Sequence, residues 1–188
     1  MPEMQRQTTE STEPTDPQPF RTREPEIAIV VALGYVWAAF NTLIGLLLAV
    51  VFYRARGFRW SDGCLEAVGG SFQRDGKTVT RIWGRPGAQT WGWFIVYRTE
   101  AHVAKAPLRV HERVHVAQGM VGGPLFLLAY GLHFLIEFAW TARFRPSRWY
   151  DAYRRVWAER MAYRIEDEFR RGLRPNAWGA NPRYFLGN

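Results

Sequence analysis

Two long apolar runs interrupt an otherwise polar chain. The first, residues 27–53, holds no charged residue and is followed by Arg54 and Arg56. As a helix it would be about 40 Å long, more than the ~30 Å hydrocarbon core of a bilayer. The pattern therefore predicts a transmembrane helix over 27–53. Residues 1–26 are rich in Thr, Glu, Gln and Pro and poor in apolar side chains, which predicts a disordered tail.

The second apolar run, residues 124–142, has a shorter apolar centre and contains His133 and Glu137. Ionisable side chains are rare and costly inside a bilayer. If this run crossed the membrane, the residues after it would lie on the opposite side from those before it. We therefore expect a buried or membrane-surface helix here, and a chain that crosses the membrane once.

Asn41 and Thr42 lie near the middle of the first apolar run. Polar side chains in lipid tend to face other helices, so we expect this pair to contact a neighbouring helix or another protein subunit. The alternative is that Thr42 bonds back to its own helix and that Asn41 is merely tolerated.

Between the two runs the sequence changes to short β-prone segments separated by turn residues. Segments 64–68, 78–83 and 91–98 predict a small antiparallel sheet of about three strands within residues 64–98. Asp75-Gly76 is the most specific turn signal among them. The 91–98 segment could hold an extended peptide by pairing along its edge.

Residues 111–115 read His-Glu-Arg-Val-His within a helix predicted at 107–121. Residues four apart lie on one helix face, so His111 and His115 can bind one Zn²⁺ ion. Glu112 can then act as general base on a metal-bound water. The plainer alternative is a solvated helix face whose two histidines bind no metal.

A third zinc ligand is expected from a long amphipathic helix predicted at 148–171. Glu159 falls on the small, apolar face of that helix, where an unpaired carboxylate is costly. The alternatives are Glu166, which we expect closer to solvent, and Glu137. A salt bridge from Glu159 to a nearby arginine would remove the metal role. Further, Gln118 shares the face of His111, where it could hydrogen-bond a ligand residue or a substrate carbonyl, and His133 could close the site with a fourth ligand.

Composition adds a membrane interpretation and excludes a disulfide framework. The net charge is +8, carried almost entirely by arginine, and the chain has nine tryptophans. Arginine interleaved with tryptophan is typical of proteins on anionic lipid, and the absence of a nucleic-acid recognition motif argues against a nucleic-acid partner. By the positive-inside rule, the arginines that follow residue 53 slightly favour a cytoplasmic location for the following domain. The single Cys64 is expected to be a buried residue.

The segments 111–118, 123–126 and 157–163 together resemble a family of small, largely uncharacterised bacterial membrane proteins. These proteins look like gluzincin-type zinc metallopeptidases, with an HExxH…E motif. The likeness extends to residues 41–46 and 62–66. The resemblance implies a bacterial inner-membrane protein with His111, His115 and Glu159 as zinc ligands and Glu112 as base. One departure is Val156-Trp157-Ala158, where similar proteins tend to have Asn-Pro-Phe before the last Glu.

These observations predict an α+β fold with one N-terminal transmembrane helix, a small antiparallel sheet and a compact helical, zincin-like domain over 58–171. Residues 172–188 are expected to form an irregular tail. The predicted function is a membrane-anchored zinc hydrolase, most naturally a metallopeptidase acting on a peptide substrate. The alternative is a non-catalytic accessory subunit of a larger membrane complex. An open coordination position facing a cleft would favour the enzyme.

Overall fold

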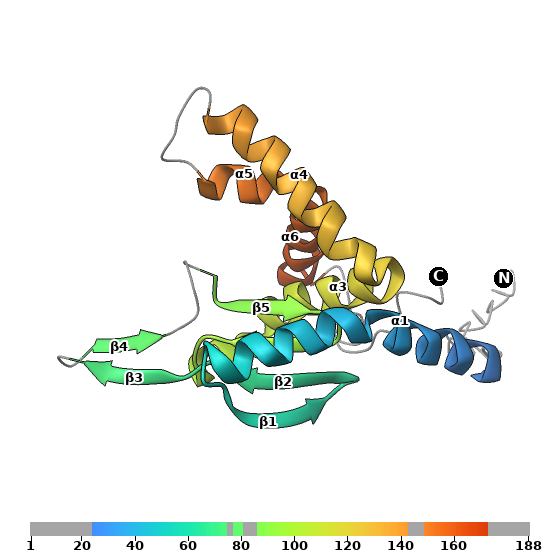
Figure 1. Ribbon diagram of the computed structural model, residues 1–188, viewed down its shortest axis with the longest axis horizontal. Coiled ribbons are helices and arrows are strands. Elements are labelled where there is room, and N and C mark those ends of the chain that lie inside the picture. The colour runs from blue at the N-terminus through green and yellow to red at the C-terminus, as the bar shows by residue number, and fades with distance from the viewer. Residues whose placement is uncertain (1–23, 75–76, 81–85, 143–148, 173–188) are drawn as a thin grey trace, which may run out of the picture.

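The computed structural model describes residues 24–74, 77–80, 86–142 and 149–172, which form a mostly helical α+β fold. Helix α1 (Glu24–Val51) runs beside a small sheet (Figure 1). The strands are β1 (Arg56–Ser61), β2 (Cys64–Val68), β3 (Ser71–Arg74), β4 (Lys77–Thr80), β5 (Ala88–Trp91) and β6 (Phe94–Tyr97). The later helices are α2 (Glu100–Val103), α3 (Ala106–Gly122), α4 (Pro124–Ala142), α5 (Trp149–Arg155) and α6 (Trp157–Arg170). Helix α3 packs on both α1 and β5, and α4, α5 and α6 extend away from the sheet (Figure 1).

The main sheet has four strands in the order β1-β2-β6-β5 and is mixed rather than antiparallel. Strands β1 and β2 pair antiparallel, as do β5 and β6, but β2 and β6 run parallel. The prediction of about three antiparallel strands was therefore wrong. The β5–β6 hairpin adds to the sheet through its second strand, which leaves β5 at the edge next to α3.

The predicted strand at 91–98 is in fact the end of one strand and the whole of another. Strand β5 ends at Trp91, Gly92 turns the chain with φ +60°, and β6 begins at Phe94. All four residues of β6 are buried and apolar, so the apolar pattern continues across the turn at Gly92. The turn could therefore not be recognised from the hydrophobic pattern. A side chain on Gly92 would collide with the Thr42 hydroxyl, so this glycine also allows α1 to approach the turn closely.

The β3–β4 hairpin forms a separate two-stranded sheet at the place predicted from Asp75-Gly76. The two strands pair antiparallel, with Arg74 opposite Lys77. The turn residues themselves lie outside the described residues, as do residues 81–83 of the predicted 78–83 strand. Most of the two predicted tails, residues 1–26 and 172–188, lies outside the described residues. The description begins with α1 at Glu24 and ends at residue 172.

Helix α1 packs one face against the rest of the chain, and its polar pair lies on that face. Asn41 and Thr42 are fully buried. Asn41 Nδ2 donates a hydrogen bond to the backbone oxygen of Gly123 at 2.6 Å. Thr42 Oγ1 donates to the Ala38 backbone oxygen at 3.2 Å and accepts from the Trp93 backbone N–H at 3.0 Å. The pair therefore contacts its own chain, and Thr42 also bonds back to its own helix.

The segment Ile29–Val51 of α1 is long and apolar enough to span a membrane, a property that it shares with signal sequences. The face of α1 that points away from the sheet is exposed and apolar. It carries Ile29, Val30, Leu33, Val36, Trp37, Phe40, Leu43, Leu47, Val50 and Val51.

The chain after α3 forms a helical hairpin that leads away from the sheet and returns (Figure 1). Helix α4 has the predicted bounds, but it is largely exposed, so the alternative of a buried helix was wrong. The single helix predicted at 148–171 is instead α5 and α6, because Val156 is extended with φ −54° and ψ 131°. The backbone N–H of Trp157, freed by this break, donates to His133 Nδ1 at 3.2 Å.

Candidate metal centre

Three buried side chains from two helices point their ligand atoms at one spot. The Nε2 atoms of His111 and His115 lie 3.2 Å apart. Glu159 closes a triangle with them, because its two carboxylate oxygens lie 3.3 Å from His111 Nε2 and 3.3 Å from His115 Nε2. Each residue is at most 7% exposed. Among the described residues, these three form the group that could hold a metal ion.

The triangle has the dimensions that a tetrahedral zinc site requires. Zinc lies about 2.0–2.1 Å from imidazole nitrogen and at a similar distance from carboxylate oxygen, so neighbouring ligand atoms lie about 3.3 Å apart. The distance between the two nitrogens and the distance from each nitrogen to its nearer Glu159 oxygen all agree with that separation, with Oε2 facing His111 and Oε1 facing His115. In addition, the buried Glu159 Oε2 lies 3.3 Å from His111 Nε2 and accepts no further hydrogen bond among the described residues. Two imidazole nitrogens beside a buried carboxylate are well suited to a divalent cation.

Apolar packing between α3 and α6 brings the three residues together. Val110 and Val114 of α3 pack on Ala162 and Ile165 of α6, and this cluster is fully or almost fully buried. The histidines lie one turn apart on α3, beside that apolar face. Glu159 lies in the first turn of α6, directly after the break at Val156. The short apolar face therefore fixes the carboxylate opposite the histidine pair.

Hydrogen bonds to the second nitrogen of each histidine fix the orientation of both rings. His111 Nδ1 lies 3.1 Å from Glu166 Oε2, and Arg170 holds the other oxygen of Glu166 at 2.6 Å. His115 Nδ1 lies 2.9 Å from Gln118 Oε1. When each Nδ1–H donates to its oxygen partner, each Nε2 lone pair is directed at the centre of the triangle. This tautomer is the one that a metal ligand needs.

Electrostatics hold the site in a charged state. Burial alone would lower the pKa of His111, but hydrogen bonds with Glu159 and Glu166 outweigh it and raise that pKa to about 10. Burial would raise the pKa of Glu159, but the charge of His115 and hydrogen bonds from both histidines hold it well below its usual range. A proton on His111 thus compensates the negative charge of the buried Glu159. A bound cation would replace that proton.

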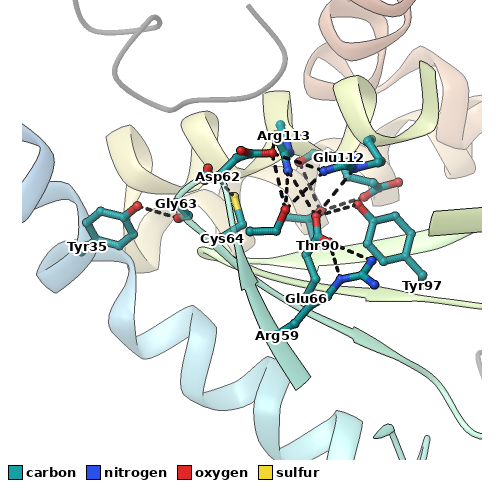
Figure 2. A network of polar contacts seen from close by, with 12 residues as sticks. Tyr35, Arg59, Asp62, Gly63, Cys64, Glu66, Thr90, Tyr97, Glu112 and Arg113 are labelled. Atoms are coloured by element: carbon teal, nitrogen blue, oxygen red, sulfur yellow. Dashed lines mark hydrogen bonds and ion pairs between the residues drawn. The ribbon is translucent and has the colours of Figure 1, made fainter. Parts of the chain in front are cut away.

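Glu112, the acidic residue of the motif, borders a cavity beside the triangle. Its Oε2 accepts a hydrogen bond from the hydroxyl of Thr90 on β5 at 2.7 Å (Figure 2). The cavity has a volume of about 240 Å³ and is lined by two of the three triangle residues, His115 and Glu159. Its remaining wall comes from β5 and from Phe126, Leu127 and Tyr130 of α4, together with Tyr153 of α5.

A second cavity, of about 370 Å³, lies on the His111 side of the site. It is lined by His111 and Glu166 and shares Glu112, Tyr153 and Pro86 with the first cavity. Glu112 and Tyr153 therefore border open space on both sides of the triangle.

Two tyrosine hydroxyls also lie close to the triangle. Tyr130 donates to Glu159 Oε1 at 2.8 Å. Burial and the charge of Glu159 raise the pKa of Tyr153, so its phenol stays protonated.

The opposite face of α3 is tied to β2 by buried ion pairs (Figure 2). Arg113, inside the motif, contacts Asp62 at 2.8 Å and the buried Glu66 at 3.3 Å. Glu66 also accepts hydrogen bonds from Arg59 at 3.2 Å and from the Tyr97 hydroxyl at 3.3 Å. The Arg113–Glu66 pair has almost no solvent access, and it links α3 to the sheet. The nearby Cys64 is fully buried, as predicted, and burial raises its pKa to about 12.

The structure brings together the residues predicted for the site. The alternative ligands Glu137, Glu166 and His133 have other partners. Glu159 pairs with the histidines and Tyr130. His133 lies 3.5 Å from Glu137 on α4, and its other nitrogen accepts the Trp157 N–H, so neither residue joins the triangle. Glu166, expected closer to solvent, instead contacts His111. Its signal was present in the sequence, because Glu166 follows Glu159 by seven residues and so shares its helix face.

No family model, curated protein or solved structure matches this chain. The case for a function therefore rests on the geometry of the candidate site.

Proposed function

We propose that this protein is a membrane-anchored, zinc-dependent hydrolase, and that it cleaves peptide bonds. One observation carries the proposal. Glu159, from a distant helix, completes a zinc-sized triangle with the two histidines of an HExxH motif, while the motif's Glu112 borders a cavity. This is the constellation of the gluzincin-type peptidases that the sequence resembles, including their downstream acidic ligand. Two imidazoles and one carboxylate leave a fourth tetrahedral position for water.

A zinc ion in this site would polarise the scissile carbonyl and bring the pKa of a bound water toward about 7. Glu112 then takes the proton from the attacking water, and the Thr90 hydroxyl holds its carboxylate in position. Glu166 and Gln118 keep the histidine rings in the ligand tautomer. Tyr153, protonated at physiological pH, supplies a hydrogen-bond donor on the cavity side of the site.

Strand β5 supports the choice of a polypeptide substrate. It is the edge strand of the main sheet, and its residues Ala88, Gln89, Thr90 and Trp91 line the first cavity. An extended peptide can add to such an edge through backbone hydrogen bonds. The segment predicted for this role, 91–98, is less suitable because β6 is paired on both sides within the sheet.

The anchor in this proposal is α1, in the inner membrane of a bacterium. The arginines after α1, including Arg54 and Arg56, favour a cytoplasmic location for the site through the positive-inside rule. The polar pair Asn41 and Thr42, a candidate contact for a partner subunit, packs within the chain. A non-catalytic accessory subunit that keeps a metallopeptidase-like fold is the competing hypothesis, and the two cavities beside the triangle favour the enzyme over it.

The test is turnover by zinc-loaded protein, purified full length in detergent and incubated with a mass-spectrometric peptide library. Wild type should cleave, and Glu112→Gln should bind zinc equally well but lose at least about 100-fold in turnover. Glu137→Gln, a carboxylate outside the triangle, is the matched control and should behave as wild type. Undiminished hydrolysis by Glu112→Gln would end this mechanism. Zinc binding by wild type with no cleavage in the library would favour the accessory subunit.

A further inference from the structure

Helix α4 has an exposed apolar face that no described part of the chain covers. Leu125, Leu128, Leu132 and Leu135 are spaced by three or four residues and are 60–70% exposed. This spacing places them along one side of the helix. Over the whole segment Pro124–Thr141, only 6% of the residues are buried. Such exposure is unusual for a helix that also contributes to a candidate active site.

The other face of α4 packs on the α5–α6 junction and lines part of the first cavity. Phe126 packs with Val156 and Ala158 at the α5–α6 junction, and Leu127 and Tyr130 line the first cavity. His133 and Glu137 are the ionisable imidazole and carboxylate of α4, and both lie toward this side. Their side chains are 28% and 24% exposed and contact each other, and His133 also accepts the Trp157 N–H at the start of α6. The outward face is therefore left without a charge.

The exposed faces of α1 and α4 are too large together for a protein surrounded by water. Seventeen large apolar residues on the two helices are at least 36% exposed. They expose on the order of 1,500 Å² of apolar side chain, against the few hundred Å² of the largest patch on a typical soluble monomer. The two helices also lie close together at the junction of α3 and α4. There Asn41 of α1 donates a hydrogen bond to the Gly123 backbone oxygen, and Trp37 donates one to the Val121 backbone oxygen.

We propose that the outward face of α4 is a second bilayer-contacting surface, which inserts among the lipid acyl chains beside α1. The composition supports lipid as the occupant, since the nineteen residues of α4 include no Lys, Arg or Asp, and His133 and Glu137 lie on the opposite side from the outward face. The charge pattern supports it too. The sequence right after α4 carries Arg143 and Arg145, as the sequence after α1 carries Arg54 and Arg56, and arginine there suits anionic headgroups.

The position of Glu159 sets the topology of this insertion. The chain returns through α5 to place Glu159 against His111 and His115, so α4 does not cross the membrane and instead lies along one side of it with its outward face among the acyl chains. With the outer face of α4 in lipid and its inner face on the first cavity, that cavity lies at the membrane boundary. This placement holds whether or not the site hydrolyses peptides.

The experiment is site-directed spin labelling of the full-length protein in vesicles of phosphatidylcholine and phosphatidylglycerol. In a Cys64→Ala background, Leu132→Cys reports on α4 and Arg164→Cys serves as the aqueous control. The side chain of Arg164 is 70% exposed on α6. Collision rates with oxygen, which concentrates in lipid, and with a water-soluble nickel complex are measured at each site. The oxygen-to-nickel ratio should be at least about tenfold higher at residue 132 than at 164.

Three results would overturn the proposal. Equal ratios at the two sites would place α4 in water, with α1 as the only membrane contact. Low access to both reagents together with spin–spin broadening would mean that a second copy covers the face. Low access to both without broadening would mean that the chain itself covers it. Leu128→Cys and Leu135→Cys report on the same face, so that one poorly folded variant does not decide the outcome.

Discussion

His111 Nδ1 lies 3.1 Å from a carboxylate oxygen of Glu166, a residue 55 positions later in the chain. The contact joins the first helix of the candidate metal centre to the second, outside the ligand triangle. It leaves the other nitrogen of His111 free to face Glu159 and His115. A carboxylate behind a ligand histidine orients the ring and makes it a better metal ligand.

Glu166→Gln should therefore weaken zinc binding by about 10- to 100-fold without abolishing it, because the three ligands remain. The measurement is competition for zinc against a chelator of known affinity. Glu168→Gln is the matched control, since Glu168 lies on the same helix and pairs with Arg164 instead. Equal affinities for wild type and Glu166→Gln would show that Glu166 plays no part in the metal site.

Thr90→Val should lower turnover while leaving zinc content unchanged. The Thr90 hydroxyl donates to Glu112, and a hydrogen bond to a charged group contributes about 1.5–3 kcal/mol, or roughly a 10- to 100-fold change. We expect the loss in kcat, with KM nearly constant, because Thr90 positions the base. Thr90→Ser restores the hydroxyl and should recover most of the rate. A loss that Ser fails to rescue would point to a packing role for this residue.

Cys64 should be nearly inert in the folded protein. Burial raises its pKa to about 12, so at pH 8 only about one thiol in ten thousand is the reactive thiolate. Because the folded-state pKa lies above that of a free thiol, reactivity should rise steadily with pH up to about 12. The measurement is the rate of reaction with a disulfide reagent, before and after unfolding in guanidinium. Rapid reaction of the native protein at pH 8 would contradict the burial of Cys64.

The two ion pairs that the buried Glu66 makes, with Arg113 of α3 and with Arg59 of β1, predict two unequal stability effects. Arg113→Met leaves Glu66 buried with less compensation, which should cost about 3–5 kcal/mol. Arg59→Met removes a partner of the same Glu66, but the Arg59 side chain is 46% exposed, so the cost should be about 1 kcal/mol or less. The check is the free energy of unfolding in detergent for both variants. Similar losses in both would contradict the view that burial of the arginine sets the strength of these pairs.

The parts of the site that depend on local periodicity were predictable from the sequence. The spacing of His111 and His115 follows from one helical turn. Glu159 stood out as a carboxylate on a small, apolar helix face. The role of Glu166 was missed because the charged residues around it suggested solvent, although its spacing from Glu159 already placed both on one face.

The parts of the fold that depend on long-range pairing were not predictable. The parallel pairing of β2 with β6 depends on where the β5–β6 hairpin docks, which no local pattern encodes. The turn at Gly92 was hidden inside a continuous apolar run. Likewise, Val156 interrupts a helix whose amphipathic pattern continues unbroken, and the compensating contact comes from His133 on another helix.

The zinc content of freshly purified full-length protein tests whether His111, His115 and Glu159 hold one zinc ion. The account predicts about one zinc per chain in wild type and in His102→Ala, a histidine of α2 outside the triangle, and little in His115→Ala or Glu159→Gln. A wild type that neither contains zinc nor binds it when supplied, or a His115→Ala variant that retains it, would contradict the account.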